Sequence, residues 1–158
     1  KNPNDVIQLV LRKKKFKSIP AEVWQFKNLR YLDLSKNKLD SIPVEIKNLK
    51  HLKVLKLSKN SFASMPNVIY ELNQLEILVV SDNEIAFLSP AIKKMVSLKS
   101  LDLYRNNLYM VPSEMGAMSA LKKVDLRGVS LNVNQQAAIR EILLNVKVYF
   151  SPPCNCNM

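Results

Sequence analysis

The sequence predicts an α/β solenoid, a coil of stacked short repeats with a parallel β-sheet along one side. The pattern L-x-x-L-x-L-x-x-N-x-L begins at residues 29, 52, 75 and 98, with Phe62, Val80 and Ile85 at three of the leucine positions, so it recurs every 23 residues. Weaker copies begin in the same phase at residues 6 and 121. A period of this length is typical of solenoids, because one repeat cannot bury its apolar side without a neighbour.

The first half of each repeat predicts a short strand that ends in a turn. In Leu32-Asp33-Leu34 the alternation places both leucines on one face and the aspartate on the other. The asparagine that follows can donate and accept hydrogen bonds, so inside the coil it can satisfy backbone groups of neighbouring turns. We therefore predict a structural asparagine ladder made of Asn37, Asn60, Asn83 and Asn106.

The second half of each repeat predicts a 3₁₀ or irregular return path. Apolar residues recur every three positions here, as at Ile46 and Leu49, and side chains three apart share one side of a 3₁₀ helix. A proline such as Pro43 fixes the entry into this segment. In the repeat that begins at residue 75, Pro90 stands one place later than in its neighbours, so we expect a small local irregularity.

The two ends of the array differ from its centre. Lys14 and Val129 occupy the asparagine position of the first and last repeats, and such a loss at the ends is typical of terminal repeats. Asn132 and Gln135 have the spacing of a helix capping box. An apolar helical face over residues 135–144 follows, and then a strand pattern over 146–150.

We therefore predict one domain over residues 1–158, for which a hydrophobic content of 47% can supply a packed core. A polar lead at 1–5 precedes six repeats over 6–131. A cap and tail at 132–158 then shield the open end of the coil, which would otherwise expose a hydrophobic sheet edge.

The motif over residues 6–131 resembles that of the leucine-rich repeat family, in its 23-residue class with the Ile-Pro element. The resemblance implies a curved, right-handed horseshoe with strands on the concave face and irregular or 3₁₀ segments on the convex side. It also implies binding of other macromolecules, most often proteins, and no catalysis. The motif is shared by many functions, so it does not identify the partner.

A partner is predicted to bind the concave face. Outward-pointing strand residues do not build the core, so their identity is free to reflect a partner. Apolar and aromatic residues gather at these positions in the central repeats, and we predict that they bind a protein: Tyr31, Val54, Ile77, Val79 and Tyr104. Such a patch is typical of an interface, although β-branched residues also simply favour strands.

A second hypothesis is a polyanion or cell-surface glycan binder, because the net charge is +11. The candidate basic rim consists of Arg12, Lys13, Lys36, Lys59 and Arg105. These residues either bind an anionic partner or surface, or form a solvated edge that discourages strand pairing. Nucleic acid is disfavoured, because lysines outnumber arginines and aromatics do not alternate with the basic run.

Catalytic and metal chemistry are not predicted. His51 is the only histidine, and no nucleophile has an identifiable base and orienting partner. Cys154 and Cys156 are two thiols without a third ligand, so they form a strained disulfide at most. We therefore predict no enzyme, no cofactor and no metal. A third hypothesis is the specificity domain of a larger enzyme.

The compartment is inferred from weaker observations. The sequence has no apolar run long enough to span a membrane. It begins with Lys1 rather than methionine, so a cleaved signal peptide is one explanation and a trimmed chain is the other. The lysine- and asparagine-rich composition favours an exported bacterial protein, at the surface or secreted, and we expect a monomer.

Overall fold

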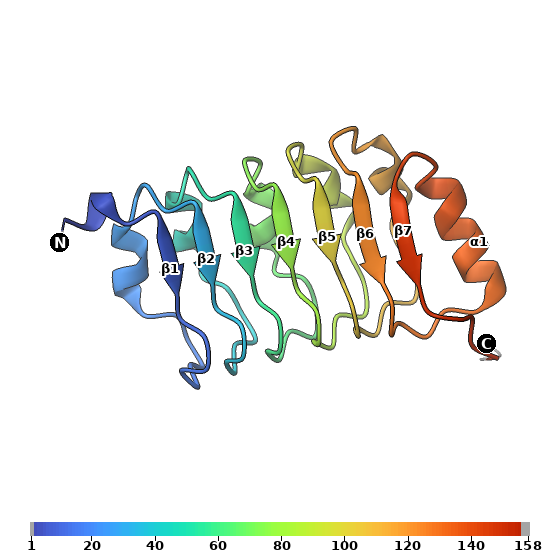
Figure 1. The fold of residues 1–158 in the computed structure, drawn as a ribbon, viewed down its shortest axis with the longest axis horizontal. Helices are drawn as coiled ribbons and strands as arrows, with labels where there is room; N and C mark the ends of the chain where they lie inside the picture. Colours follow the sequence, from blue (N-terminus) through green and yellow to red (C-terminus); the bar gives the residue numbers. More distant parts are fainter. Residues whose placement is uncertain (1, 156–158) are drawn as a thin grey trace.

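The computed structural model describes residues 2–155 and contains one sheet of seven parallel strands in chain order (Figure 1). Neighbouring strands pair in register, and β1 to β6 begin every 23 residues. The strands are β1 (Gln8–Val10), β2 (Tyr31–Asp33), β3 (Val54–Lys56), β4 (Ile77–Val79), β5 (Ser100–Asp102), β6 (Lys123–Leu126) and β7 (Lys147–Phe150). This is the predicted solenoid, with one strand in each turn of the coil.

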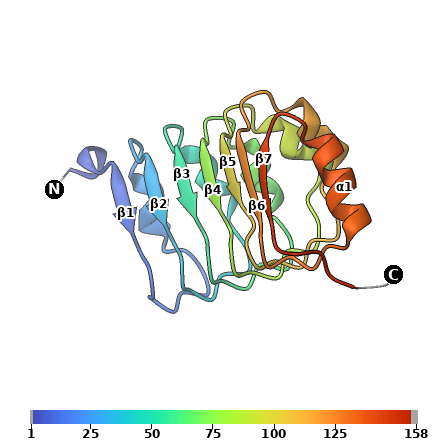
Figure 2. The same cartoon turned by 45° about the vertical axis from the view of Figure 1, so that its right-hand side comes forward.

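Short 3₁₀ helices form the returns and lie behind the sheet (Figure 2). Five of them have five residues each, and Pro3–Asp5 (η1) adds a turn at the start. The five are η2 (Ala21–Gln25), η3 (Val44–Asn48), η4 (Asn67–Glu71), η5 (Pro90–Lys94) and η6 (Ser113–Ala117). Their apolar residues three apart point into the coil, so the predicted 3₁₀ return path is confirmed.

The core lies between the strands and the returns. The register stacks Leu32, Leu55, Leu78 and Leu101 in a column, and each is fully buried. Burying one such side chain is worth about 1.5–3 kcal/mol. Phe62 fills the position that Leu39 holds in the preceding repeat and is also fully buried. The repeats therefore stabilise one another through this core. Within residues 2–155, no other element covers the opposite face of the sheet (Figures 1 and 2).

Helix α1 (Val133–Ile142) and strand β7 close the C-terminal end. Asn132 and Gln135 form the predicted capping box, with hydrogen bonds of 2.9 and 2.8 Å. The cap buries Leu126 and Leu131, whereas Leu9 at the other end is only partly buried. The helix begins and ends two residues earlier than predicted.

Close packing of the cap requires a glycine at Gly116. A Cβ atom there would lie 2.8 Å from the carbonyl oxygen of Ile142, at the end of α1.

Cys154 is disulfide-bonded. The only other cysteine of the sequence, Cys156, lies outside the described residues.

The expected irregularity at Pro90 is a change of helix cap. Proline precedes the 3₁₀ helix in the other repeats, but Ser89 holds this position before η5 and its hydroxyl accepts the N–H of Ala91. Unlike proline, Ser89 has a backbone N–H, which donates to the hydroxyl of the buried Tyr70 at 3.0 Å. Tyr70 therefore satisfies a donor that this repeat alone carries at the cap, and burial raises the pKa of its phenol.

A Tyr70→Phe substitution is expected to lower the free energy of unfolding by about 0.5–1.5 kcal/mol, because it leaves the partly buried Ser89 N–H without its acceptor. In a Ser89→Pro background, which has no such donor, the same Tyr70→Phe change should cost much less. Urea unfolding of the native chain, both single variants and the double variant measures the two costs and accounts for the cap that Ser89→Pro removes. An equal cost of Tyr70→Phe in both backgrounds would show that Tyr70 acts through packing alone.

Candidate functional site

Asparagine side chains hold the turn that ends each strand. In Asn60, Nδ2 donates to the carbonyls of Leu57 (2.9 Å) and Leu34 (3.2 Å), and Oδ1 accepts the N–H of Leu39 at 3.0 Å. The amides of Asn37, Asn83 and Asn106 make equivalent bonds to their own and the preceding repeat. These bonds hold the turn that follows each strand and keep the outward rows of neighbouring repeats aligned.

The residue just before each ladder position has a left-handed backbone. Its φ is 60° at Lys36, 57° at Lys59, 52° at Asp82 and 50° at Arg105. In the last repeat Gly128 holds this position with φ of 75°. Left-handed backbone excludes β-branched residues, so this edge row carries long or small polar side chains. This constraint was not predicted from the sequence, where Gly128 is its clearest signal.

The outward residues of the seven strands form what we call the strand face. On β2, β3 and β4, the register places Tyr31, Val54 and Ile77 side by side. Val79 lies two residues beyond Ile77, in the next outward row. Ile77 is 37% exposed, and the other three are partly buried. We call these four residues the apolar island.

Tyr104 lies apart from the apolar island, beyond the end of β5. The guanidinium groups of Arg105 and Arg127 form cation–π contacts with its ring, at 5.1 and 6.0 Å from the ring centroid. Arg127 also lies 5.6 Å from the ring centroid of Tyr149, on β7. The predicted patch thus spans two clusters. Tyr149 was not among the predicted site residues because residues 146–150 were assigned to the cap. The strand alternation nevertheless places Tyr149 on this face, where it pairs with Asp125.

The basic rim separates into paired and unpaired cations. Arg12 Nε lies 3.5 Å from a carboxylate oxygen of Asp33, and Arg105 Nη1 lies 3.7 Å from one of Asp82. Lys13, Lys36 and Lys59 form no ion pair with any described residue. The lysines are therefore the cations of the rim that are available to a partner.

The aspartates of the strand face have structural contacts. Each accepts the N–H two residues later: Asp33 from Ser35, Asp102 from Tyr104 and Asp125 from Arg127. Arg127 Nη2 also lies 2.6 Å from Asp125. Burial works against this carboxylate, but the hydrogen bonds from Arg127 outweigh it and lower the pKa of Asp125. Burial and the nearby Asp125 raise the pKa of Asp102. Asp125 thus forms an ion pair with Arg127.

Glu76 joins three repeats at the opposite ends of the strands. Its carboxylate accepts hydrogen bonds from Lys53 Nζ (2.5 Å) and Lys99 Nζ (2.6 Å), one repeat away on each side. These two bonds lower the pKa of Glu76 to about 2. Glu76 therefore bridges two lysines at the edge where the strands begin.

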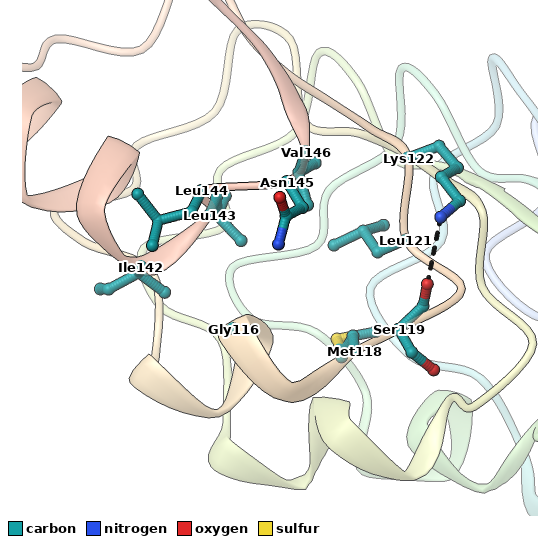
Figure 3. Close-up of a pocket in the computed structure, with 10 residues that line it drawn as sticks. All are labelled: Gly116, Met118, Ser119, Leu121, Lys122, Ile142, Leu143, Leu144, Asn145 and Val146. Carbon is teal, nitrogen blue, oxygen red and sulfur yellow. Dashed lines mark hydrogen bonds between the residues drawn. The ribbon is translucent and has the colours of Figure 1, made fainter.

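A separate cavity of about 410 Å³ lies between the cap and η6, away from the strand face (Figure 3). Met118, Leu121, Ile142 and Val146 give it an apolar lining. Lys122, whose Nζ donates to the Ser119 carbonyl at 3.3 Å, is the only ionisable side chain among the described residues that line it. The cavity therefore contains no acid–base pair.

Residues 2–155 contain no cluster of three or more histidine, cysteine or acidic side chains placed to hold a metal ion. Among the same residues, no helix has the length and apolar character needed to cross a membrane.

Comparison with known proteins places the chain in a family. A model described as a leucine-rich repeat region matches residues 6–148, so the chain belongs to the leucine-rich repeat proteins. The family and its fold generally serve as non-catalytic protein-interaction modules. No curated protein sequence matches the chain.

Solved structures with the same fold come from bacteria and plants. A leucine-rich repeat protein of Leptospira interrogans has 30% identity and a TM-score of 0.85, and the match covers 93% of this chain and 38% of that one. The ectodomain of the Arabidopsis thaliana receptor kinase GASSHO1/SCHENGEN3, in complex with Casparian strip integrity factor 2, has 31% identity and a TM-score of 0.69, covering 93% and 19%. The plant peptide hormone receptor RGFR1, in complex with RGF2, has 30% identity and a TM-score of 0.70, covering 90% and 24%. The chain thus spans less than half the length of each.

An Asn60→Ala substitution is expected to lower the free energy of unfolding by roughly 1–3 kcal/mol or more, because it removes partners from backbone groups inside the coil. Lys59→Ala is the matched control. It should change stability by less than about 0.5 kcal/mol, because alanine and lysine tolerate the left-handed backbone equally poorly. Urea melts compare the two. Similar losses would contradict the role of the ladder.

Glu76→Gln tests the lysine bridge through pH. The folded pKa of Glu76 lies below that of the unfolded chain, so its contribution to stability is present above the unfolded value and is lost as pH falls toward about 2. The native chain should therefore have the higher urea midpoint at pH 7. The gap to the variant should narrow progressively below about pH 5. A gap that does not depend on pH would show that the charge of Glu76 is not involved.

Proposed function

We propose that the chain is a non-catalytic binding module that holds a protein partner on the strand face over β2, β3 and β4. The observation that carries this proposal is the apolar island, which occupies the middle of a sheet whose other face is the core. Apolar side chains there can be desolvated by a partner without disturbing the fold. Tyr31 supplies the kind of aromatic side chain that dominates binding energy at interfaces.

The hydrogen bonding of the sheet supports the same proposal. Every strand is hydrogen-bonded to its neighbour, and the ladder bonds fix the turn that follows. A preordered surface loses little conformational entropy when a partner binds. The names of the two plant receptor structures describe complexes with peptide or protein ligands, and we extend this mode of action to the present chain.

The second candidate function is binding of a polyanion or cell-surface glycan through the basic rim. It is favoured by the unpaired Lys13, Lys36 and Lys59 and by the net charge of +11. Such binding weakens steeply with salt. The third hypothesis, a specificity domain of a larger enzyme, stays a prediction, as do a bacterial origin, export and a monomeric state.

Affinity capture from whole lysate and from a surface extract tests the proposed function. The variant is Tyr31→Ala, Ile77→Glu, Val79→Glu. It should lose a protein that the native chain retains, because it removes an anchor and places charge in the apolar island. The matched control, Val44→Glu with Val96→Glu, puts the same charge on exposed residues outside the strand face. This control should retain the protein.

Both variants must first match the native chain in thermal melting. Retention of the same proteins by all three chains would contradict the proposal. If all three instead retain anionic material that salt removes, the basic rim is the functional surface.

A further inference from the structure

A polar hollow of about 370 Å³ adjoins the apolar island on the strand face. Its floor contains Ser35, Ser58 and Ser81, which occupy equivalent positions in three consecutive repeats. The same position is held by Arg12 in the repeat before and by Tyr104 in the repeat after. The hollow therefore exists because three small side chains lie between two large ones.

The floor of the hollow presents hydroxyl groups. Ser81 Oγ donates to Ser58 Oγ at 2.9 Å. The backbone N–H groups of Lys36 and Lys59, next to this floor, already donate to the Ser58 and Ser81 carbonyls. Direct recognition in the hollow therefore depends on its hydroxyl groups and its charged side chains.

Among the charged side chains that line the hollow, the cations without an ion pair outnumber the carboxylates without one. Lys36, Lys56 and Lys59 line it and form no ion pair with any described residue. Two of the lining carboxylates are already used, since Asp33 pairs with Arg12 and Asp82 pairs with Arg105. Asp102 is the only lining carboxylate without an ion pair in the described part of the chain. Three free ammonium groups thus face one free carboxylate.

Lys56 connects the hollow to the apolar island. Its Nζ lies 5.3 Å from the ring centroid of Tyr31, a cation–π contact that holds the ammonium group at the border. Val54 precedes Lys56 by two residues and Ser58 by four on one chain. An extended chain rises about 3.3 Å per residue, so two to four residues span roughly 7–13 Å. A partner whose apolar and anionic groups lie that far apart can contact Val54 and the hollow at the same time.

We propose that the strand face selects a protein partner whose extended segment carries an aspartate or glutamate two to four residues from an apolar side chain. The carboxylate enters the hollow among Lys36, Lys56 and Lys59. It accepts hydrogen bonds from the hydroxyls of Ser35 and Ser58, because Ser81 already donates to Ser58. The apolar side chain packs on the apolar island. This inference rests on the proposed function, since it specifies the chemistry of the partner for the same face.

Selection from a random dodecamer peptide library at 150 mM salt tests the inference with a defined probe. The test variant is Lys36→Asn, Lys56→Gln, Lys59→Asn, in which asparagine tolerates the left-handed backbone of the two edge positions. The control variant, Lys27→Gln, Lys50→Gln, Lys93→Gln, removes the same charge from exposed lysines outside the hollow. The apolar-island variant described above is the third comparison.

The native chain and the control variant are expected to enrich peptides with an acidic residue two to four positions from an apolar one. The test variant should bind the best such peptide roughly tenfold more weakly. Replacing the acidic residue of this peptide by asparagine or glutamine should weaken its binding to the native chain to the same degree. The same replacement should not weaken its binding to the test variant further.

Five outcomes would overturn the inference. Enrichment without an acidic preference, or an acidic preference that the test variant retains, leaves the proposed function intact but removes the role of the hollow. Equal enrichment on the native chain and on the apolar-island variant counts against the proposed function itself. An acidic preference that the control variant loses as well would show a response to net charge, as would binding of free sulfated glycan in place of the peptides.

Discussion

Each turn of the coil leaves backbone N–H and C=O groups at the edge of a core made of leucine, and asparagine side chains satisfy them. One amide serves its own repeat and the one before it, as Asn60 does with Leu57 and Leu34. An unsatisfied backbone group in such a place is costly. The asparagine therefore fixes where the strand ends and how successive turns stack, and the register of the whole sheet follows from it.

The ladder leaves the strand face free for binding. Every inward position is committed to the core, and the edge row is restricted by its left-handed backbone. Apart from the aspartates that accept backbone N–H groups at the strand ends, the outward residues have neither constraint. Apolar, hydroxyl and cationic side chains can therefore be placed there in many arrangements. In this chain the arrangement is a short apolar row on β2 to β4 beside a hollow floored with serines and lined by lysines.

The sequence predicted most of the fold because its period is set by packing against identical neighbours. Leu32 and Leu55 occupy equivalent positions, so one repeat predicts the next, and the capping box of Asn132 and Gln135 is a local signal. The bond from Ser89 to Tyr70 was not predictable, because it depends on an exception in one repeat and a side chain in the repeat before it.

The sequence predicted which residues lie in each outward row of the candidate site. It did not predict which of their side chains contact one another. Alternation along a strand places Tyr31 and Val54 outward, and the constant period places them side by side. Alternation does not show toward which neighbour a long side chain extends. The contacts of Tyr104 with two arginines and the pairing of Arg12 with Asp33 therefore came only from the structure. The hollow depends on the relative sizes of neighbours across five strands, which no single-repeat motif records.

The most direct test of this account is methyl NMR of the chain titrated with a captured partner or a selected peptide. Binding at the strand face predicts shifts for the methyl groups of Val54, Ile77 and Val79, while those of Val44, Val96 and Leu144, which are exposed elsewhere, stay in place. Shifts at the second group with none at the first would contradict the account, because the partner would then bind a different surface.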